Sequence, residues 1–112
     1  MLGLMSATIP NLPAIVVMLE DIKRRKGMFF GERAEDGEMF LSGFFVALIA
    51  TGVPMTWDSW RATIERRGWD WDSCGFLPGM KAKGLDDEEI LNELIDSLVD
   101  ELRHFASAEV GT

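Results

Sequence analysis

Apolar residues recur with helical spacing in four stretches of the chain, and each stretch is flanked by residues that start or stop helices. In the first stretch, Met18, Leu19 and Ile22 fall on one helical face, Pro13 suits a first turn, and Gly27 marks the end. Thr56 and Gly68 bracket the third stretch in the same way. The pattern predicts helices over residues 13–25, 37–51, 57–67 and 86–105.

The second stretch is apolar on nearly every side, which is typical of a central helix. One of its faces carries Phe40, Phe44 and Leu48, and a second carries Leu41, Phe45 and Ile49. We assign the first face to the core. Gly43 and Ala47 are small and four residues apart, so we expect another helix to approach closely there.

The fourth stretch has the clearest helix start. Asp86 with Glu89 three residues later resembles a capping box. The apolar stripe that follows is two residues wide, more than one small domain strictly requires. We therefore expect it to pack on the second helix and also on a twofold mate, as in small homodimers.

The remaining segments are harder to assign. Residues 68–84 are rich in Gly and predict a long loop, and residues 28–30 or 69–72 are candidates for a very short β element. The fold predicted is an all-α, single-domain bundle of four main helices over residues 1–112, with 1–12 and 106–112 loosely ordered. The expected core comprises Leu19, Ile22, Phe40, Phe44, Leu48, Trp60, Ile64, Leu94, Leu98 and Leu102.

Composition and charge narrow the function. The chain has 112 residues, one Cys, one His and a net charge of −8, all of which lies in residues 85–112. An acidic chain disfavours nucleic-acid binding, and a single Cys and a single His exclude a disulfide framework and a Cys/His zinc site. The uncharged stretches lack the basic start of a signal peptide or the length of a membrane span. We expect a cytoplasmic protein without cofactor or metal.

A short segment resembles a motif of small uncharacterised bacterial proteins. The chain reads R-K-G-M-F-F-G at 25–31 and F-L-S-G-F at 40–44, with Ala47 following, where those proteins read roughly R-P-G-M-Y-L-G and F-L-x-G-Y-x-x-A. Lys26, Phe29 and Phe30 depart from that pattern, which loses a proline and a tyrosine hydroxyl. Some of those proteins look like toxin-immunity proteins, and others are orphan genes of mobile elements. The resemblance implies an immunity-like or accessory role and assigns no functional residue.

Catalysis is disfavoured, because no residue set supplies both a nucleophile and a base. His104 suits a solvated helix end, and Cys74 has no base nearby in sequence. Aromatic and acidic residues interleave over residues 57–80, which suits either a small-molecule site or a cover for the edge of the core. The residues of that candidate ligand site are Trp57, Trp60, Trp69, Trp71, Asp70 and Asp72.

An acidic stripe on the fourth helix is the other candidate site. It consists of Glu89, Glu93, Asp96 and Asp100. Such a stripe serves either solubility or recognition of a basic protein. We expect a non-catalytic interaction protein, a homodimer with a possible basic partner, and we keep a small-molecule-binding protein as the alternative.

Overall fold

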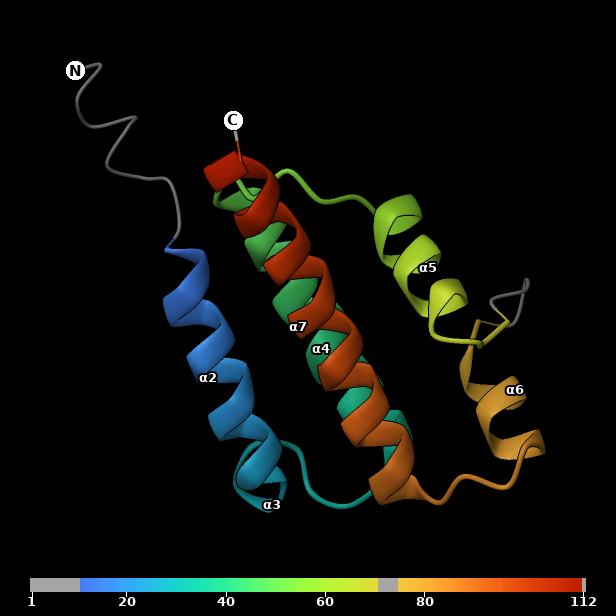
Figure 1. Cartoon of the computed structure of the whole chain (residues 1–112). Helices are drawn as coiled ribbons and strands as arrows, with labels where there is room; N and C mark the ends of the chain where they lie inside the picture. Colours follow the sequence, from blue (N-terminus) through green and yellow to red (C-terminus); the bar gives the residue numbers. More distant parts are fainter. Residues whose placement is uncertain (1–10, 71–74, 112) are drawn as a thin grey trace.

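The computed structural model describes residues 11–70 and 75–111, with side chains up to Phe105. Helices account for all the regular secondary structure of these residues, which confirms the all-α fold (Figure 1). The helices are α2 (Leu12–Arg24), α3 (Lys26–Phe29), α4 (Ala34–Ala50), α5 (Trp57–Arg66), α6 (Leu77–Ala82) and α7 (Asp87–Gly111).

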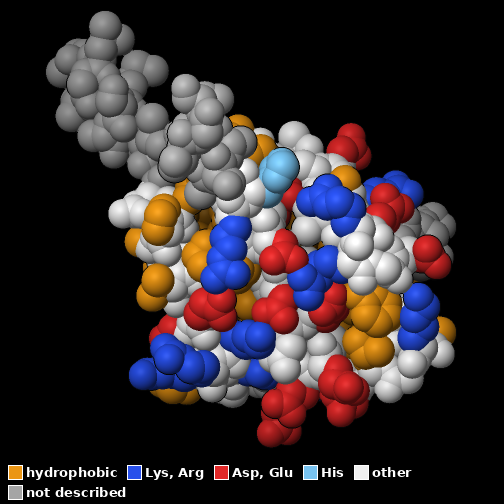
Figure 2. Space-filling model, viewed as in Figure 1, with side chains coloured by type: hydrophobic (Ala, Val, Ile, Leu, Met, Phe, Trp, Pro, Cys, Tyr) orange, Lys and Arg blue, Asp and Glu red, His pale blue; other side chains and the backbone are white. Residues whose placement is uncertain are grey.

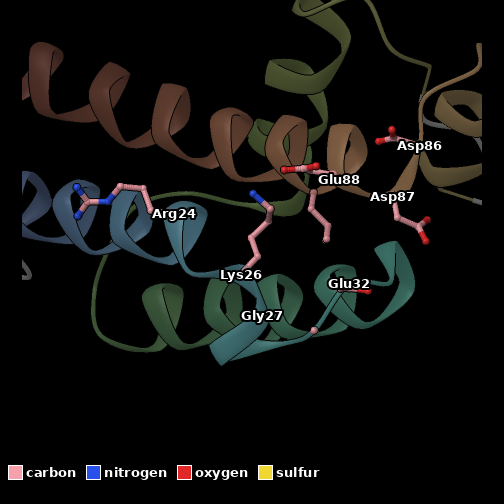
Figure 3. Close-up of a pocket in the computed structure, with 9 residues that line it drawn as sticks. Arg24, Lys26, Gly27, Glu32, Asp86, Asp87 and Glu88 are labelled. Carbon is pink, nitrogen blue, oxygen red and sulfur yellow. The ribbon is translucent and has the colours of Figure 1, made fainter.

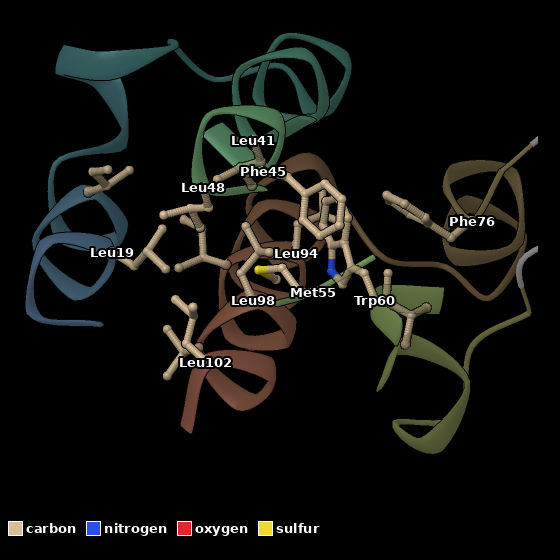
Figure 4. Packing of buried hydrophobic residues seen from close by; sticks show 14 of the residues in the cluster. Leu19, Leu41, Phe45, Leu48, Met55, Trp60, Phe76, Leu94, Leu98 and Leu102 are labelled. Atoms are coloured by element: carbon tan, nitrogen blue, oxygen red, sulfur yellow. The ribbon is translucent and has the colours of Figure 1, made fainter. Parts of the chain in front are cut away.

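The last helix, α7, is the centre of the bundle. α2, α4, α5 and α6 all pack against it (Figure 1). Its apolar stripe is buried within one chain: Phe105 at its end is partly buried, and Figure 4 shows Leu94, Leu98 and Leu102 in the core. Seven members are 3% exposed or less: Ile90, Leu91, Leu94, Ile95, Leu98, Val99 and Leu102. The expectation that this stripe would also serve a twofold mate is therefore wrong. Its width instead lets α7 contact several helices at once.

The helix starts follow from local chemistry. Thr56 and Ser59 form a reciprocal capping box at α5. At α7 the Asp86 carboxylate accepts from the Glu89 N–H at 2.8 Å, and the Glu89 carboxylate accepts from the Asp86 N–H at 2.9 Å. These bonds satisfy backbone N–H groups that the helix itself leaves without acceptors, as the sequence predicts.

Most of the predicted core is confirmed. Eight of its ten residues are buried: Leu19, Ile22, Leu48, Trp60, Ile64, Leu94, Leu98 and Leu102 (Figure 4). The prediction is wrong for Phe40 and Phe44, which are only partly buried, whereas Leu41 and Phe45 are 0% exposed. The side of α4 that faces the core therefore combines Leu41 and Phe45 of the second predicted face with Leu48 of the first, while Ile49 is exposed.

The close approach of two helices is also displaced from the predicted position. It occurs at Gly37, where an added Cβ would lie 1.8 Å from the Leu91 Cδ2 atom of α7. Gly43 and Ala47 are exposed, and an added Cβ on Gly43 would have no heavy atom within 4 Å. Ala34, Gly37, Leu41, Phe45 and Leu48 form the buried face, and the absence of a side chain at Gly37 allows the close approach to α7.

Two smaller predictions are corrected. Residues 28–30 contain no strand, since the short helix α3 extends to Phe29; of 69–72, Trp69 and Asp70 are irregular, and the other two lie outside the described residues. The long loop contains α6, which buries Leu77 and Met80 against the core. Leu12 is buried at the start of α2, and α7 continues to Gly111.

Candidate interaction surfaces

The acidic stripe of α7 is held by cations and N–H groups of the same chain. Glu93 accepts from the Arg67 Nε and Nη2 groups at 2.7 and 3.0 Å, and from the Trp69 indole N–H at 2.8 Å. Asp100 pairs with the same guanidinium, and Asp96 accepts from Lys23 Nζ at 2.9 Å. Figure 2 shows basic and acidic side chains interleaved on this face of the molecule.

Electrostatics at this ion-pair cluster follow from the contacts. Hydrogen bonds from Arg67, and then from Trp69, lower the pKa of the Glu93 carboxyl and outweigh its partial burial. The Glu93 and Asp100 carboxylates in turn raise the pKa of the Arg67 guanidinium above its ordinary value. The stripe thus fastens α7 to α2 through Asp96 and to the end of α5 through Arg67. As a surface for a basic partner it stays a prediction, with much of its charge balanced within the chain.

The tryptophan-rich segment splits into two groups. Trp60 is 1% exposed and donates its indole N–H to Ser97 Oγ at 2.9 Å, and Trp57 stacks beside it with ring centroids 5.9 Å apart. Both rings also pack on Phe45, at 4.4 Å for Trp57 and 4.8 Å for Trp60. These two tryptophans therefore belong to the aromatic part of the core and its edge, as the core-cover interpretation expects.

In the second group, the described tryptophan is Trp69, and residues of the same chain contact both its indole N–H and its ring face. Trp69 donates to Glu93, and Lys83 Nζ lies 5.1 Å from the centre of its ring. The cation on this aromatic face is therefore one of the chain's own residues. Asp70 is exposed, and Trp71 and Asp72 lie outside the described residues, as does Cys74.

Among the pockets lined by described residues, three lie elsewhere on the surface. One of about 580 Å³ opens where the end of α2 and α3 faces the start of α7 (Figure 3). Its charged residues have both signs, and Lys26 already donates at 2.8 Å to the Asn92 side chain and to the Lys23 carbonyl oxygen. A second, of about 540 Å³, lies beside it along α2 and shares Arg24 and Lys26 with it.

The third pocket, of about 510 Å³, gathers basic side chains from α5 and α7. Its lining residues are Thr63, Arg66, Arg67, Asp100, Arg103 and His104. The arginines have acceptors within the chain: Arg66 donates to Thr63 Oγ1 at 2.9 Å, Arg67 to Glu93, and Arg103 to Glu20 at 3.5 Å. None of the three pockets is lined by a tryptophan, and none gives a distinctive arrangement for one ligand class.

An exposed apolar surface on α4 is the feature that the sequence interpretation missed. Met39 is 77% exposed, Val46 52% and Ile49 37%, and the small residues Gly43 and Ala47 lie between them. We call the exposed side of α4, formed by Met39, Gly43, Val46, Ala47, Ile49 and Ala50, the α4 outer face.

The surface continues onto α3. Phe29 is 43% exposed and its ring centroid lies 6.2 Å from that of the partly buried Phe40, while the neighbouring Met28 is 76% exposed. The sequence signal for this surface was present, since α4 is apolar all round. Apolar residues on most sides of a helix are typical of a central helix, whereas in the structure only one side of α4 is buried.

No family model matches the chain, and no curated protein or solved structure is similar enough to count as a match. Within the described residues, no helix combines the length and apolar character needed to cross a membrane. The same residues hold no group of three or more His, Cys, Asp or Glu side chains arranged to bind a metal ion.

Proposed function

We propose that the protein is a non-catalytic interaction protein that binds a protein partner through the α4 outer face. One observation carries the proposal: from Met39 to Ala50 the exposed side of α4 carries no charged residue, and the described residues already form a core without it. Contiguous exposed apolar surface is costly in water and marks interaction sites in folded proteins. Single exposed apolar residues are ordinary, but here they share one side of one helix and extend to α3.

The other candidate surfaces are already engaged by residues of the same chain, which supports the α4 outer face as the binding surface. The acidic stripe is engaged by Arg67, Lys23 and local caps, and the described tryptophans pack or donate within the chain. By comparison, Met39, Val46 and Ile49 remain exposed after the chain has folded. The proposal keeps the non-catalytic interaction protein expected from the sequence. It differs in the binding surface, which is on α4 and not on α7.

The chain's own methionines provide the test. Met39 and Met28 are more than three-quarters exposed, while Met55 and Met80 are 2% and 1% exposed. Peroxide converts exposed methionine to sulfoxide, and mass spectrometry reads each site separately. In cells that naturally make the protein, we expect Met39 to be oxidised much more slowly than in dilute purified protein carrying Val46→Glu.

The buried methionines serve as the internal control. Met55 and Met80 should be oxidised slowly in both settings, which shows that the chain stays folded. Met28 reports whether the interface extends onto α3. Equal oxidation of Met39 in cells and in the dilute variant would show that the α4 outer face is free in the cell, and would refute the proposal.

A further inference from the structure

The sizes of four side chains on the α4 outer face suggest what covers it. Met39, Gly43, Val46 and Ala50 follow one another at intervals of four, three and four residues. This is the spacing of the contact seam in paired helices. Along the seam the residues alternate in size, large at Met39 and Val46 and small at Gly43 and Ala50.

That order becomes complementary when the helix meets itself in the opposite direction. A twofold axis between residues 44 and 45 places position 39 opposite position 50, and position 43 opposite position 46. Each contact then joins a large residue to a small one: Met39 to Ala50 of the partner subunit, and Gly43 to the partner's Val46. Large side chains seated over small ones are what close helix packing requires.

The charge pattern also favours a second copy. No charged residue occurs between Met39 and Trp57, although the chain as a whole carries −8. Two copies repel each other where residues 85–112, which carry the whole net charge, approach their counterparts. They can meet without charge repulsion at the interface itself only where that interface is uncharged, and α4 supplies such a face. The same net charge disfavours an anionic membrane as the occupant.

The apolar area exposed on α3 and α4 approaches the area that a small specific dimer buries. The large apolar side chains exposed on α3 and α4 present on the order of 500 Å² per copy, against about 600 Å² per partner at the lower end of specific interfaces. Gly43, Ala47, Ala50 and the half-buried Phe40 and Phe44 add to that surface.

We infer that two copies of this chain pair through α4 in antiparallel orientation, with Gly43 opposite the partner's Val46. The inference rests on the proposed function, because it names the partner at the same face. It assigns Gly43 a role that the single chain does not need: within one chain a larger residue there meets nothing.

Three variants and one control test the pairing by sedimentation velocity over a concentration series. Wild-type protein should be a dimer at micromolar concentrations. Val46→Glu should raise the dissociation constant at least about 100-fold, because it places two carboxylates in an apolar seam. Ala62→Glu adds the same charge at an exposed position of α5 and should leave the dimer unchanged.

The register is tested by mixing complementary variants. Gly43→Glu and Val46→Lys should each be monomeric alone, with melting temperatures close to that of the Val46→Glu monomer, since both positions are exposed within the chain. An equimolar mixture should form a heterodimer, because the new carboxylate then faces the new ammonium group at one contact and the other contact remains Gly43 against Val46.

A monomeric wild type at about 100 μM, or a Val46→Glu protein that still dimerises, would overturn the inference. Failure of the mixture to associate would overturn the antiparallel register. Monomeric protein with Met39 protected only in cells would refute the second copy and leave the proposed function standing, with a different protein as partner. Protection in dilute monomer would show that another part of the same chain covers the face.

Discussion

The neighbouring residues Phe44 and Phe45 provide a sharp test of which face of α4 is buried. Phe45 is 0% exposed and packs against both Trp57 and Trp60, with ring centroids 4.4 and 4.8 Å away. Replacing a buried Phe with Ala costs about 3–5 kcal/mol through lost burial and the cavity left behind. Phe44 is half-buried, so Phe44→Ala should cost only about 1–1.5 kcal/mol.

The assay is urea unfolding followed by tryptophan fluorescence and by circular dichroism, with all proteins at one concentration. The difference in unfolding free energy between Phe45→Ala and Phe44→Ala should be at least about 2 kcal/mol, which is large against a total stability of about 5–15 kcal/mol. Coincident transitions from the two probes would show that the comparison is two-state.

Equal losses in the two variants, or a larger loss for Phe44→Ala, would refute this orientation of α4. The α4 outer face would then be placed incorrectly, and the proposed interface with it. The sequence alone favours Phe44 as the core residue, so this pair of variants distinguishes the two assignments directly.

Two further predictions concern charge and capping. Glu93→Gln should destabilise the protein at pH 7 by about 1–3 kcal/mol, because the carboxylate accepts charged hydrogen bonds from Arg67. The folded-state pKa of Glu93 is held below its ordinary value of 4.5, so this stabilisation is present above that pH and is lost as pH falls through the folded pKa. Urea unfolding at pH 7 and pH 3 should therefore show the two proteins converging in acid; a constant gap would contradict the ion-pair explanation. Asp86→Ala should cost about 1 kcal/mol by removing the cap of α7, whereas Asp87→Ala, which removes a neighbouring carboxylate without a cap bond, should cost less. Equal losses would show that the cap bond contributes little.

The sequence predicts much of this fold because the terminal helix is strongly patterned. Its capping box, apolar stripe and buried leucines require only local spacing, and the structure confirms them. The same holds for α5, where Thr56 caps the helix and Trp60 and Ile64 share the buried face.

α4 shows where such reasoning fails. A helix that is apolar all round has no polar face to indicate which side is buried, so Phe40 and Phe44 fit the pattern as well as Leu41 and Phe45 do. In the structure, the buried face includes Gly37, where α4 approaches Leu91 of α7 too closely for a side chain. That contact joins residues more than fifty positions apart, so the spacing of apolar residues within one helix does not predict it.

The spacing of the acidic stripe does not predict its ion-pair partners, for a related reason. Spacing on α7 correctly places Glu93 and Asp100 near each other, and both pair with Arg67. That arginine lies just after α5, and Lys23, which binds Asp96, lies on α2. The positions of these two residues depend on how α2 and α5 pack on α7. The sequence pattern places the stripe on a solvated helix face, whereas in the structure most of its carboxylates pair with residues of the same chain.

The most direct test of the central claim is the oxidation rate of Met39 relative to Met55 in cells that make the protein. Binding at the α4 outer face predicts that this ratio falls at least about fivefold from its value in dilute Val46→Glu protein, because a covered thioether is shielded from peroxide. An unchanged ratio would mean that α4 presents its apolar side to water in the cell, which would contradict the account.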